Sequence, residues 1–494
     1  LRTVSKNEGG VARITTERTI YLQNENYLSY NNVFNDIHSI NAMIGASWNK
    51  NNWEKAHAET WGFSDDFYQY NNLGVGSNPK PSSSDWDEWR MNSYFGRINY
   101  TYDNRYLATI TMRVDGSSRF GANNKYAVFP SGALAWRISE EAFMKSVEFI
   151  SNLKLRTSYG MTGNDAIPNF RSISSTGNYT AIFDHNRYNG VGISRIPNPD
   201  LKWERTGQFD IGVDVGLFNN RLNFTLDYYY KKTHDLLLDA PIASTTGYTS
   251  LMRNIGNLQN KGIELTINAT PIETNDFTWN IDFVLSSNKN KILKLGEKNE
   301  DIYMGPYFLD ATNILRVGEA VNSFVGYVRE GTWSLLEEAE AAKYGRKPGD
   351  LKFKDLNGDN KIDANDRTII GNGLPKFDGN LSTSFRYKNV DLSLDLAFRY
   401  GNDVLRLDYS TAEDRQTLGN SFSSVLNAWT KDNQNTDIAS VRVDSQGDGS
   451  ELKLNSHYIE DGSFIRGSNL VLGYNFSDDI LKKIKLQKLR LFVN

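Results

Sequence analysis

Apolar and polar side chains alternate with a period of two through most of this chain. In 221–230, for example, the order is Arg221, Leu222, Asn223, Phe224, Thr225, Leu226, Asp227 and Tyr228. Successive side chains of a β-strand point to opposite faces, so this pattern predicts strands with one apolar face and one polar face.

About fifteen segments of this kind follow one another along the chain, with ends accurate to a few residues. They are 10–18, 26–34, 37–48, 92–102, 105–114, 126–138, 151–161, 209–217, 221–230, 258–270, 277–285, 377–387, 391–400, 464–476 and 487–494.

The connections between these segments alternate between short and long. Tight turns are expected at 34–37, 102–105, 218–221, 271–276 and 387–390, and short helical connections at 139–150 and 477–486. Long polar connections are expected at 50–90, 115–125, 162–201, 231–257, 288–376 and 401–463. Short periplasmic turns and long extracellular loops are typical of outer-membrane barrels. The predicted fold class is therefore all-β, a large antiparallel transmembrane β-barrel.

The composition agrees with this fold and excludes several others. No stretch approaches the roughly 18 consecutive apolar residues of a spanning helix. The mean hydropathy of -0.54 suits a barrel, because only alternate residues of each strand face lipid. The net charge of -4 gives no sign of nucleic-acid binding, and the lack of cysteine excludes disulfides and cysteine nucleophiles.

Charged residues occupy the polar face of the predicted strands. A dry protein core could not hold them all in paired form, so we expect a lumen filled by water or by a plug. They are Arg97, Arg105, Arg113, Lys154, Arg156, Asp214, Asp227, Asp395 and Arg399.

Several short segments, in this order and spacing, resemble the barrel of the SusC/RagA-type TonB-linked outer-membrane proteins of the Bacteroidetes. The resemblance runs through the whole chain. The segments are Tyr94–Tyr100 with Arg105-Tyr106, Arg113–Gly121, Asn198–Glu204, Asp227–Lys232, Asn260–Leu265 and Asp461–Arg466 with Leu472–Tyr474.

The resemblance implies a barrel of about 22 strands in the outer membrane, filled by an N-terminal plug. It further implies TonB-dependent import of large nutrients, glycan or peptide, with a SusD-like surface lipoprotein as lid. No plug, TonB-contacting segment or signal peptide is recognised in 1–494, and the last strand or strands are expected to be missing. We therefore expect an incomplete barrel domain.

Within the loop region 288–376, residues 355–366 have the ligand spacing of an EF-hand calcium loop. Oxygen donors stand at the required positions, and the predicted ligands are Asp355, Asn357, Asp359, the backbone carbonyl of Lys361, Asp363 and Asp366. Asn360 replaces the usual glycine at position six, and Asp366 replaces glutamate at position twelve, as in dockerin-like loops. The alternative is a solvated loop of Asx turns without a metal. We predict a structural calcium ion in an extracellular loop.

No catalytic motif occurs in the chain, and we expect no enzyme activity. Acidic runs such as Asp85, Asp87 and Glu88 are interpreted as solvated loop faces. Aromatic residues of the long loops could stack on sugars or pack the loops together, and the residues that bind substrate stay unknown; these aromatics are Trp86, Trp89, Tyr248, Tyr307, Trp333 and Trp429. The alternative function is that of a secreted carbohydrate-active or carbohydrate-binding β-protein with a dockerin-like calcium loop.

Overall fold

The computed structural model describes residues 9–65, 67–184, 186–248, 250–305, 311–413, 420–441 and 454–494. Its main feature is one large sheet in which each strand pairs with the next along the chain. The strands, in sheet order, are β1 (Val11–Phe34), β2 (His38–Trp61), β4 (Ser83–Tyr102), β5 (Tyr106–Ser117), β6 (Tyr126–Arg137), β7 (Ile150–Asn164), β10 (Glu204–Leu217), β11 (Leu222–His234), β14 (Asn257–Glu273), β15 (Phe277–Lys294), β22 (Phe377–Tyr387), β23 (Val390–Tyr400), β26 (Phe464–Asn475) and β27 (Arg490–Val493). This up-and-down order confirms the predicted antiparallel β fold.

The chain divides into two compact units. The first consists of residues 1–134, 159–207 and 235–255, and the second of 135–158, 208–234 and 256–494.

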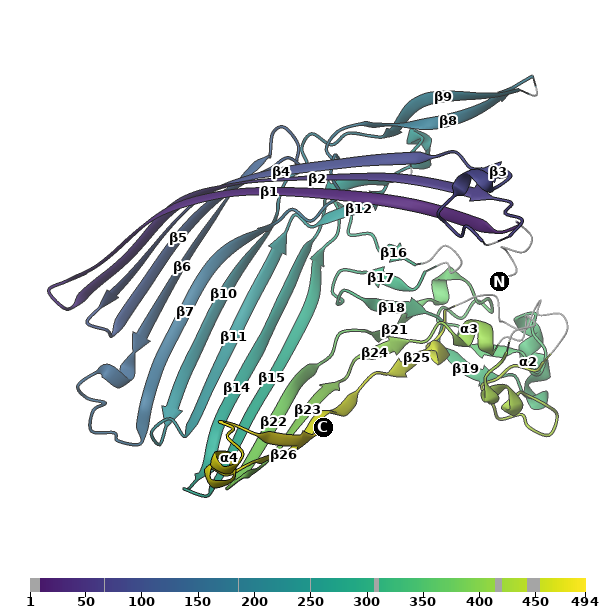
Figure 1. Cartoon of the computed structure of the whole chain (residues 1–494). Helices are drawn as coiled ribbons and strands as arrows, with labels where there is room; N and C mark the ends of the chain where they lie inside the picture. The colour runs from purple at the N-terminus through teal and green to yellow at the C-terminus, as the bar shows by residue number, and fades with distance from the viewer. Residues whose placement is uncertain are drawn as a thin grey trace. The chain divides into compact units, whose positions relative to one another are not determined.

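In the first unit, β1, β2 and β4 lie side by side as three long antiparallel strands (Figure 1). The loops of this unit carry the two-residue strand β3 (Asn78–Pro79) and two hairpins. The hairpins are β8 (Ser175–Phe183) with β9 (Asn186–Arg195), and β12 (Leu237–Pro241) with β13 (Ser250–Asn254). The unit also has the short 3-10 helices η1 (Leu73–Val75) and η3 (Ser244–Thr246).

In the second unit, β11, β14, β15, β22, β23 and β26 pair in sequence. Its loops form small sheets from β16 (Ile302–Met304), β17 (Asn313–Leu315), β18 (Ser323–Gly326), β19 (Arg329–Thr332), β20 (Leu351–Phe353), β21 (Thr368–Asn372), β24 (Asp403–Leu405) and β25 (Ile459–Asp461). The helical segments are η2 (Ile138–Glu140), η4 (Leu335–Glu337), α2 (Glu338–Lys343), η5 (Ala364–Asp366), α3 (Tyr409–Ala412), η6 (Ser423–Asn427), η7 (Ser456–Tyr458) and α4 (Asp478–Lys483). Among the described residues, no helix has the length and apolar character needed to cross a membrane.

The tight turns have the backbone that their sequences favour. Asp103 and Asn104 join β4 to β5 with φ of +47° and +50°. Two successive residues with positive φ match the twist of a hairpin, and Asp and Asn tolerate this conformation better than most residues. Asn35 and Asp36 do the same between β1 and β2.

Several strand predictions were too short, including 277–285, because β15 continues to Lys294 in the predicted connection 288–376. The predicted strands 10–18 and 26–34 form the single strand β1, and β2 and β4 extend into the predicted loop 50–90 as far as Trp61 and back to Ser83. The polar residues of these extensions were interpreted as loop. A strand that continues beyond the membrane needs no apolar face, because water reaches both of its sides.

Candidate functional site

The two faces of the sheet differ in chemistry, as the alternation predicted. In the first unit, one face carries large apolar side chains that are exposed: Ile44 (64%), Ile98 (54%), Ile110 (68%) and Met112 (56%). The register places Ile44 and Met112 in one cross-strand row and Ile98 and Ile110 in the next, and these two rows form an apolar column on one face of β2, β4 and β5. An exposed apolar surface of this kind is favourable against lipid and costly in water.

The opposite face of the same strands carries a row of bonded polar groups. The amide of Asn99 donates to Asn41 at 2.9 Å, and the hydroxyl of Thr109 donates to Asn99 at 2.9 Å. Further along, Arg113 donates to Asp115 at 2.8 Å and to Ser93 at 2.8 Å. These polar contacts lie where the sequence placed the lumen.

In the second unit, the polar face holds a charged group centred on Arg156. Its guanidinium donates twice to Asp214, at 2.9 Å each, and once to Asp227 at 3.1 Å. Lys154 lies 3.6 Å from Asp214. The structure therefore brings four of the predicted inward charges together. The two cations and two anions pair with one another, and water in the lumen can hydrate the rest of their polar atoms.

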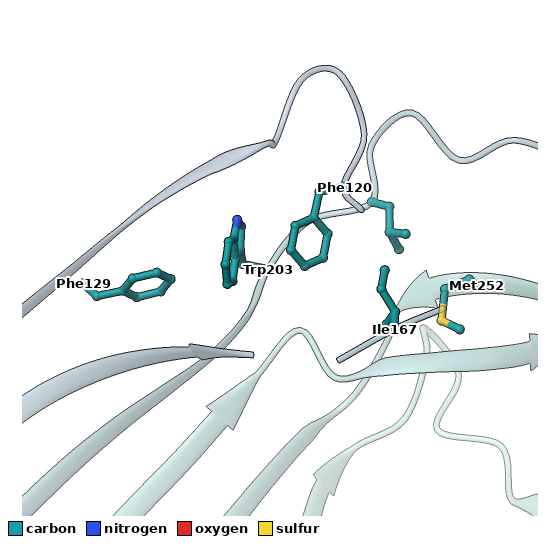
Figure 2. Close-up of a cluster of buried hydrophobic side chains, with 6 residues drawn as sticks. Phe120, Phe129, Ile167, Trp203 and Met252 are labelled. Carbon is teal, nitrogen blue, oxygen red and sulfur yellow. The ribbon is translucent and has the colours of Figure 1, made fainter. Parts of the chain in front are cut away.

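Two of the recognised sequence segments meet in a buried aromatic cluster of the first unit. Figure 2 shows the indole of Trp203 between the rings of Phe120 and Phe129, at centroid distances of 4.9 and 5.5 Å. Trp203 is 4% exposed and donates its indole N–H to the carbonyl of Lys125 at 2.9 Å. Leu201, which is fully buried, completes the cluster together with Ile167 and Met252.

The polar residues of these segments fix the same loops. Arg119 donates to Asn169 at 2.7 Å and to the carbonyl of Asp165 at 3.0 Å. Asn198 donates to the carbonyl of Met252 at 2.8 Å. The segments 113–121 and 198–204 therefore hold the loops of this unit in place, and this structural role explains their residue types without any ligand.

The predicted calcium loop forms a compact series of Asx turns after β20. The carboxylate of Asp355 accepts backbone N–H groups from Gly358 (2.6 Å) and Asn360 (2.9 Å). Partial burial acts to raise the pKa of Asp355, but the bonds from Asn360 and Gly358 outweigh it and lower the pKa below its ordinary value. Asn360 has φ of +60°, the left-handed backbone that the sixth position of such a loop requires.

The last predicted ligand, Asp366, is fully buried at the end of η5. Its two oxygens accept the N–H groups of Leu356 (2.8 Å) and Asp363 (2.9 Å). No group of three or more His, Cys, Asp or Glu side chains is arranged to hold a metal in the part of the chain that the structure describes. All six predicted ligands offer oxygen atoms, which calcium prefers. In this structure the carboxylates of Asp355 and Asp366 accept hydrogen bonds from backbone N–H groups.

The aromatic residues of the loops have different environments. Trp333 is 4% exposed, with the ring of Tyr344 at 5.6 Å and the ammonium of Lys352 at 4.8 Å from its ring, so it packs its loop. Trp86 and Trp89 were predicted in a loop but lie in β4, and Trp86 is 52% exposed and stacks on Phe170 at 5.7 Å. Tyr307 lies outside the described residues.

Sequence reasoning missed a polar group inside the second unit. His457 Nε2 lies 2.7 Å from a carboxylate oxygen of Glu413, and Ser424 donates to Glu413 at 2.6 Å. Burial acts to raise the pKa of Glu413, but the contacts with His457 and Ser424 lower it overall. No local spacing could have revealed this group, because its members lie far apart in the sequence.

Comparison with known proteins gives the family. The model of the family described as "TonB dependent receptor-like, beta-barrel" matches residues 3–335. TonB-dependent receptor P3 of Formosa agariphila is 38% identical over 493 residues, which cover 98% of this chain and 48% of that protein. TonB-dependent receptor SusC of Bacteroides thetaiotaomicron is 35% identical over 398 residues, or 78% of this chain and 38% of SusC.

Solved structures agree with this result. A chain of the RagAB peptide transporter superposes with a TM-score of 0.83 at 26% identity, over 97% of this chain and 51% of that one. The present chain thus spans about half the length of the curated relatives it matches. Because the family model covers more than half of it, the chain belongs to the TonB-dependent receptor-like β-barrel family of the outer membrane and is of the SusC/RagA type.

Proposed function

We propose that the protein is a TonB-dependent transporter that imports a large nutrient, glycan or peptide, with a SusD-like surface lipoprotein as its lid. The likeness to the RagAB peptide transporter over 97% of the chain carries this proposal. In the proposed transporter, the strands described above form part of the barrel wall, and a plug coupled to TonB opens the path through the lumen.

The polar face of the sheet supports a transport role. Arg156 of β7 bonds Asp214 of β10 and Asp227 of β11, and Arg113 bonds Asp115 within β5. These charged groups on the inward face suit a wet lumen better than a packed apolar core. A barrel of about 22 strands has a lumen wide enough for a plug, and a wall of bonded polar groups suits a plug that moves in water.

The ligand class stays open between glycan and peptide. RagAB is named a peptide transporter, and this name concerns that protein alone. Exposed aromatic side chains such as Trp86, at the start of β4, suit stacking on a sugar ring and packing against a lid equally well.

Affinity purification from native outer membranes, followed by mass spectrometry of proteins and small molecules, tests the proposal. We expect a surface lipoprotein in stoichiometric amount together with an oligosaccharide or oligopeptide. Recovery of the protein with neither a lipoprotein nor an oligomeric ligand, in cells grown on the nutrient mixtures that induce it, would contradict the proposal.

The alternative of a secreted carbohydrate-active protein has no support, because the family consists of outer-membrane receptors and transporters and not of enzymes.

We also propose that residues 355–366 bind a structural calcium ion. The support is the register of oxygen donors, the left-handed backbone at Asn360 and the buried carboxylate of Asp366. The ion would be held by Asp355, Asn357, Asp359, the Lys361 carbonyl, Asp363 and Asp366, and its two positive charges would offset half of the negative charge of the four carboxylates.

A further inference from the structure

The lipid-facing side of β1, β2 and β4 carries a hollow of about 390 Å³ beyond the apolar column described above. Six of its lining residues share that face by strand register: Leu22, Asn24, Trp48, Lys50, Arg90 and Asn92. They continue the column of Ile44 and Ile98, so the hollow opens toward the surroundings of the barrel and not toward the lumen.

The position of the hollow along the strands places it at one surface of the membrane. Lys50 stands twelve positions after His38, the first residue of β2, which follows a short turn. At about 3.3 Å per residue and a tilt of about 40°, Lys50 lies roughly 30 Å from that turn, beyond an apolar band about 25 Å tall. At the end of the hollow next to the apolar column, Trp48 and Tyr94 form an edge-to-face pair at 6.3 Å, as in an interfacial aromatic girdle. The hollow therefore lies at the headgroup level of the outer leaflet.

The charge of the hollow is positive. Lys50 and Arg90 are direct cross-strand partners, and both bond the same carboxylate, Glu88, at 3.1 and 2.7 Å. Two cations against one anion leave one positive charge. Arg90 binds Glu88 through Nε, its side chain is 61% exposed, and its terminal nitrogens have no partner in the described part of the chain. These nitrogens form a fork that matches two phosphate oxygens.

The position of the hollow on the outward face determines which kind of anion can reach it. A soluble nutrient enters the barrel through the lumen, whereas the outward face at this height meets lipid headgroups. The amides of Asn24 and Asn92 supply neutral donors beside the cations, and the exposed Leu22 and the indole of Trp48 offer apolar surface to acyl chains and sugar rings. A phosphorylated lipid presents both of these chemistries in one molecule.

We propose that this hollow binds the phosphorylated headgroup of an outer-leaflet lipid, with Lys50 and Arg90 on the phosphate and Leu22 and Trp48 against its apolar part. Glu88 holds both cations in place and competes with the phosphate for them. The site rests on the family's location in the outer membrane and is independent of the transported nutrient.

The test is titration of the intact protein, purified in a nonionic detergent, with lipid A, and measurement of the bound fraction by native mass spectrometry. Removal of both cations in the K50Q/R90Q variant should weaken binding at least about tenfold, since two charge-assisted hydrogen bonds are lost. Glu88→Gln should strengthen binding, because the competing carboxylate is gone. A purely structural role for the three residues would predict weaker binding or no change in the Glu88→Gln variant, and either result would overturn the proposal.

Three controls make the result specific. Arg18→Gln removes a cation from the same face of β1 outside the hollow, and it should leave binding unchanged. The wild type and all variants should bind dephosphorylated lipid A with the same low affinity. Inorganic phosphate alone should not displace lipid A at equal concentration; displacement would show a site for free phosphate and contradict a lipid site. Circular dichroism checks that each variant keeps its β-structure, and unchanged lipid A binding by a folded K50Q/R90Q variant would also contradict the proposal.

Discussion

Gly121 lies so close to Pro199 that a Cβ atom at Gly121 would stand 1.8 Å from the Pro199 carbonyl oxygen. The N–H of Gly121 also donates to the carbonyl of Leu201 at 3.0 Å. Two loops far apart in the sequence thus touch through their backbones, beside the aromatic cluster of Trp203.

Gly121→Ala should therefore push these loops apart. Overpacking of a well-filled site costs about 1–3 kcal/mol, and we expect the upper end because both neighbours are backbone. Urea unfolding in detergent measures the change in the free energy of unfolding. Gly467→Ala is the matched control, since no atom lies within 4 Å of its added Cβ, and equal losses in the two variants would contradict the close approach.

Leu394→Arg should destabilise the barrel, whereas Ser393→Arg should have little effect. Leu394 lies four residues after the start of β23 at Val390, near the middle of the apolar band, and an arginine facing lipid there costs about 2–4 kcal/mol. Ser393 faces the lumen, where an arginine stays hydrated. Folding titrations in lipid vesicles compare the two variants, and equal effects would show that the faces are assigned incorrectly.

Glu337 should make the loop that contains η4 and β20 sensitive to acid. Its carboxylate accepts from Lys352 at 2.7 Å and from the backbone N–H and hydroxyl of Ser334, and these bonds lower its pKa from 4.5 to about 2. A lowered carboxylate pKa contributes stability above the unfolded value, and this contribution is lost as the pH falls from about 4.5 through about 2.

The protection factors of the backbone amides of Trp333 and Leu351, which compare the measured exchange rate with that of an unfolded chain at the same pH, should fall over that pH range in the wild type. In Glu337→Gln the protection factors should already be lowered at neutral pH and should change less with acid. A wild-type loop whose protection does not change between pH 5 and pH 2 would contradict the role of this carboxylate.

Calcium should bind residues 355–366 and protect that loop from proteolysis. Isothermal titration of the chelator-treated protein should show heat of binding that is lost in the D355N/D359N variant, since two carboxylate ligands disappear. Glu340→Gln, an exposed acidic residue of the nearby helix α2, is the control and should bind as the wild type does. Absence of binding heat in the wild type would refute the site.

The strands of the barrel could be predicted from the sequence because lipid on one side and water on the other impose a period of two. All fifteen predicted segments lie in the main sheet, with the first two joined in β1. The extensions of β2 to Trp61 and of β4 to Ser83 could not be predicted, since both faces are wet there and polar residues such as Asp85 and Asp87 carry no alternation.

The contacts between loops could not be predicted from the sequence either. The motif residues Trp203 and Phe120 were recognised, but their packing against each other depends on a fold that brings distant segments together. The same holds for Lys50, Glu88 and Arg90, of which the acidic member was interpreted as part of a solvated loop. The register between β2 and β4 brings Lys50 beside Arg90 and Glu88, and local spacing in the sequence does not show this.

Spin labelling gives the most direct test of whether this sheet is the wall of a membrane barrel, and the absence of cysteine from these 494 residues allows labels at single introduced cysteines. Single cysteines at 94–101 of β4, labelled with a nitroxide in protein reconstituted into lipid bilayers, report the collision rates with oxygen and with a water-soluble nickel chelate. We expect the two rates to alternate with a period of two, with oxygen favoured at the Ile98 position and the chelate at the Arg97 position. Equal access of the chelate to both positions would contradict the assignment of this sheet as the wall of a membrane barrel.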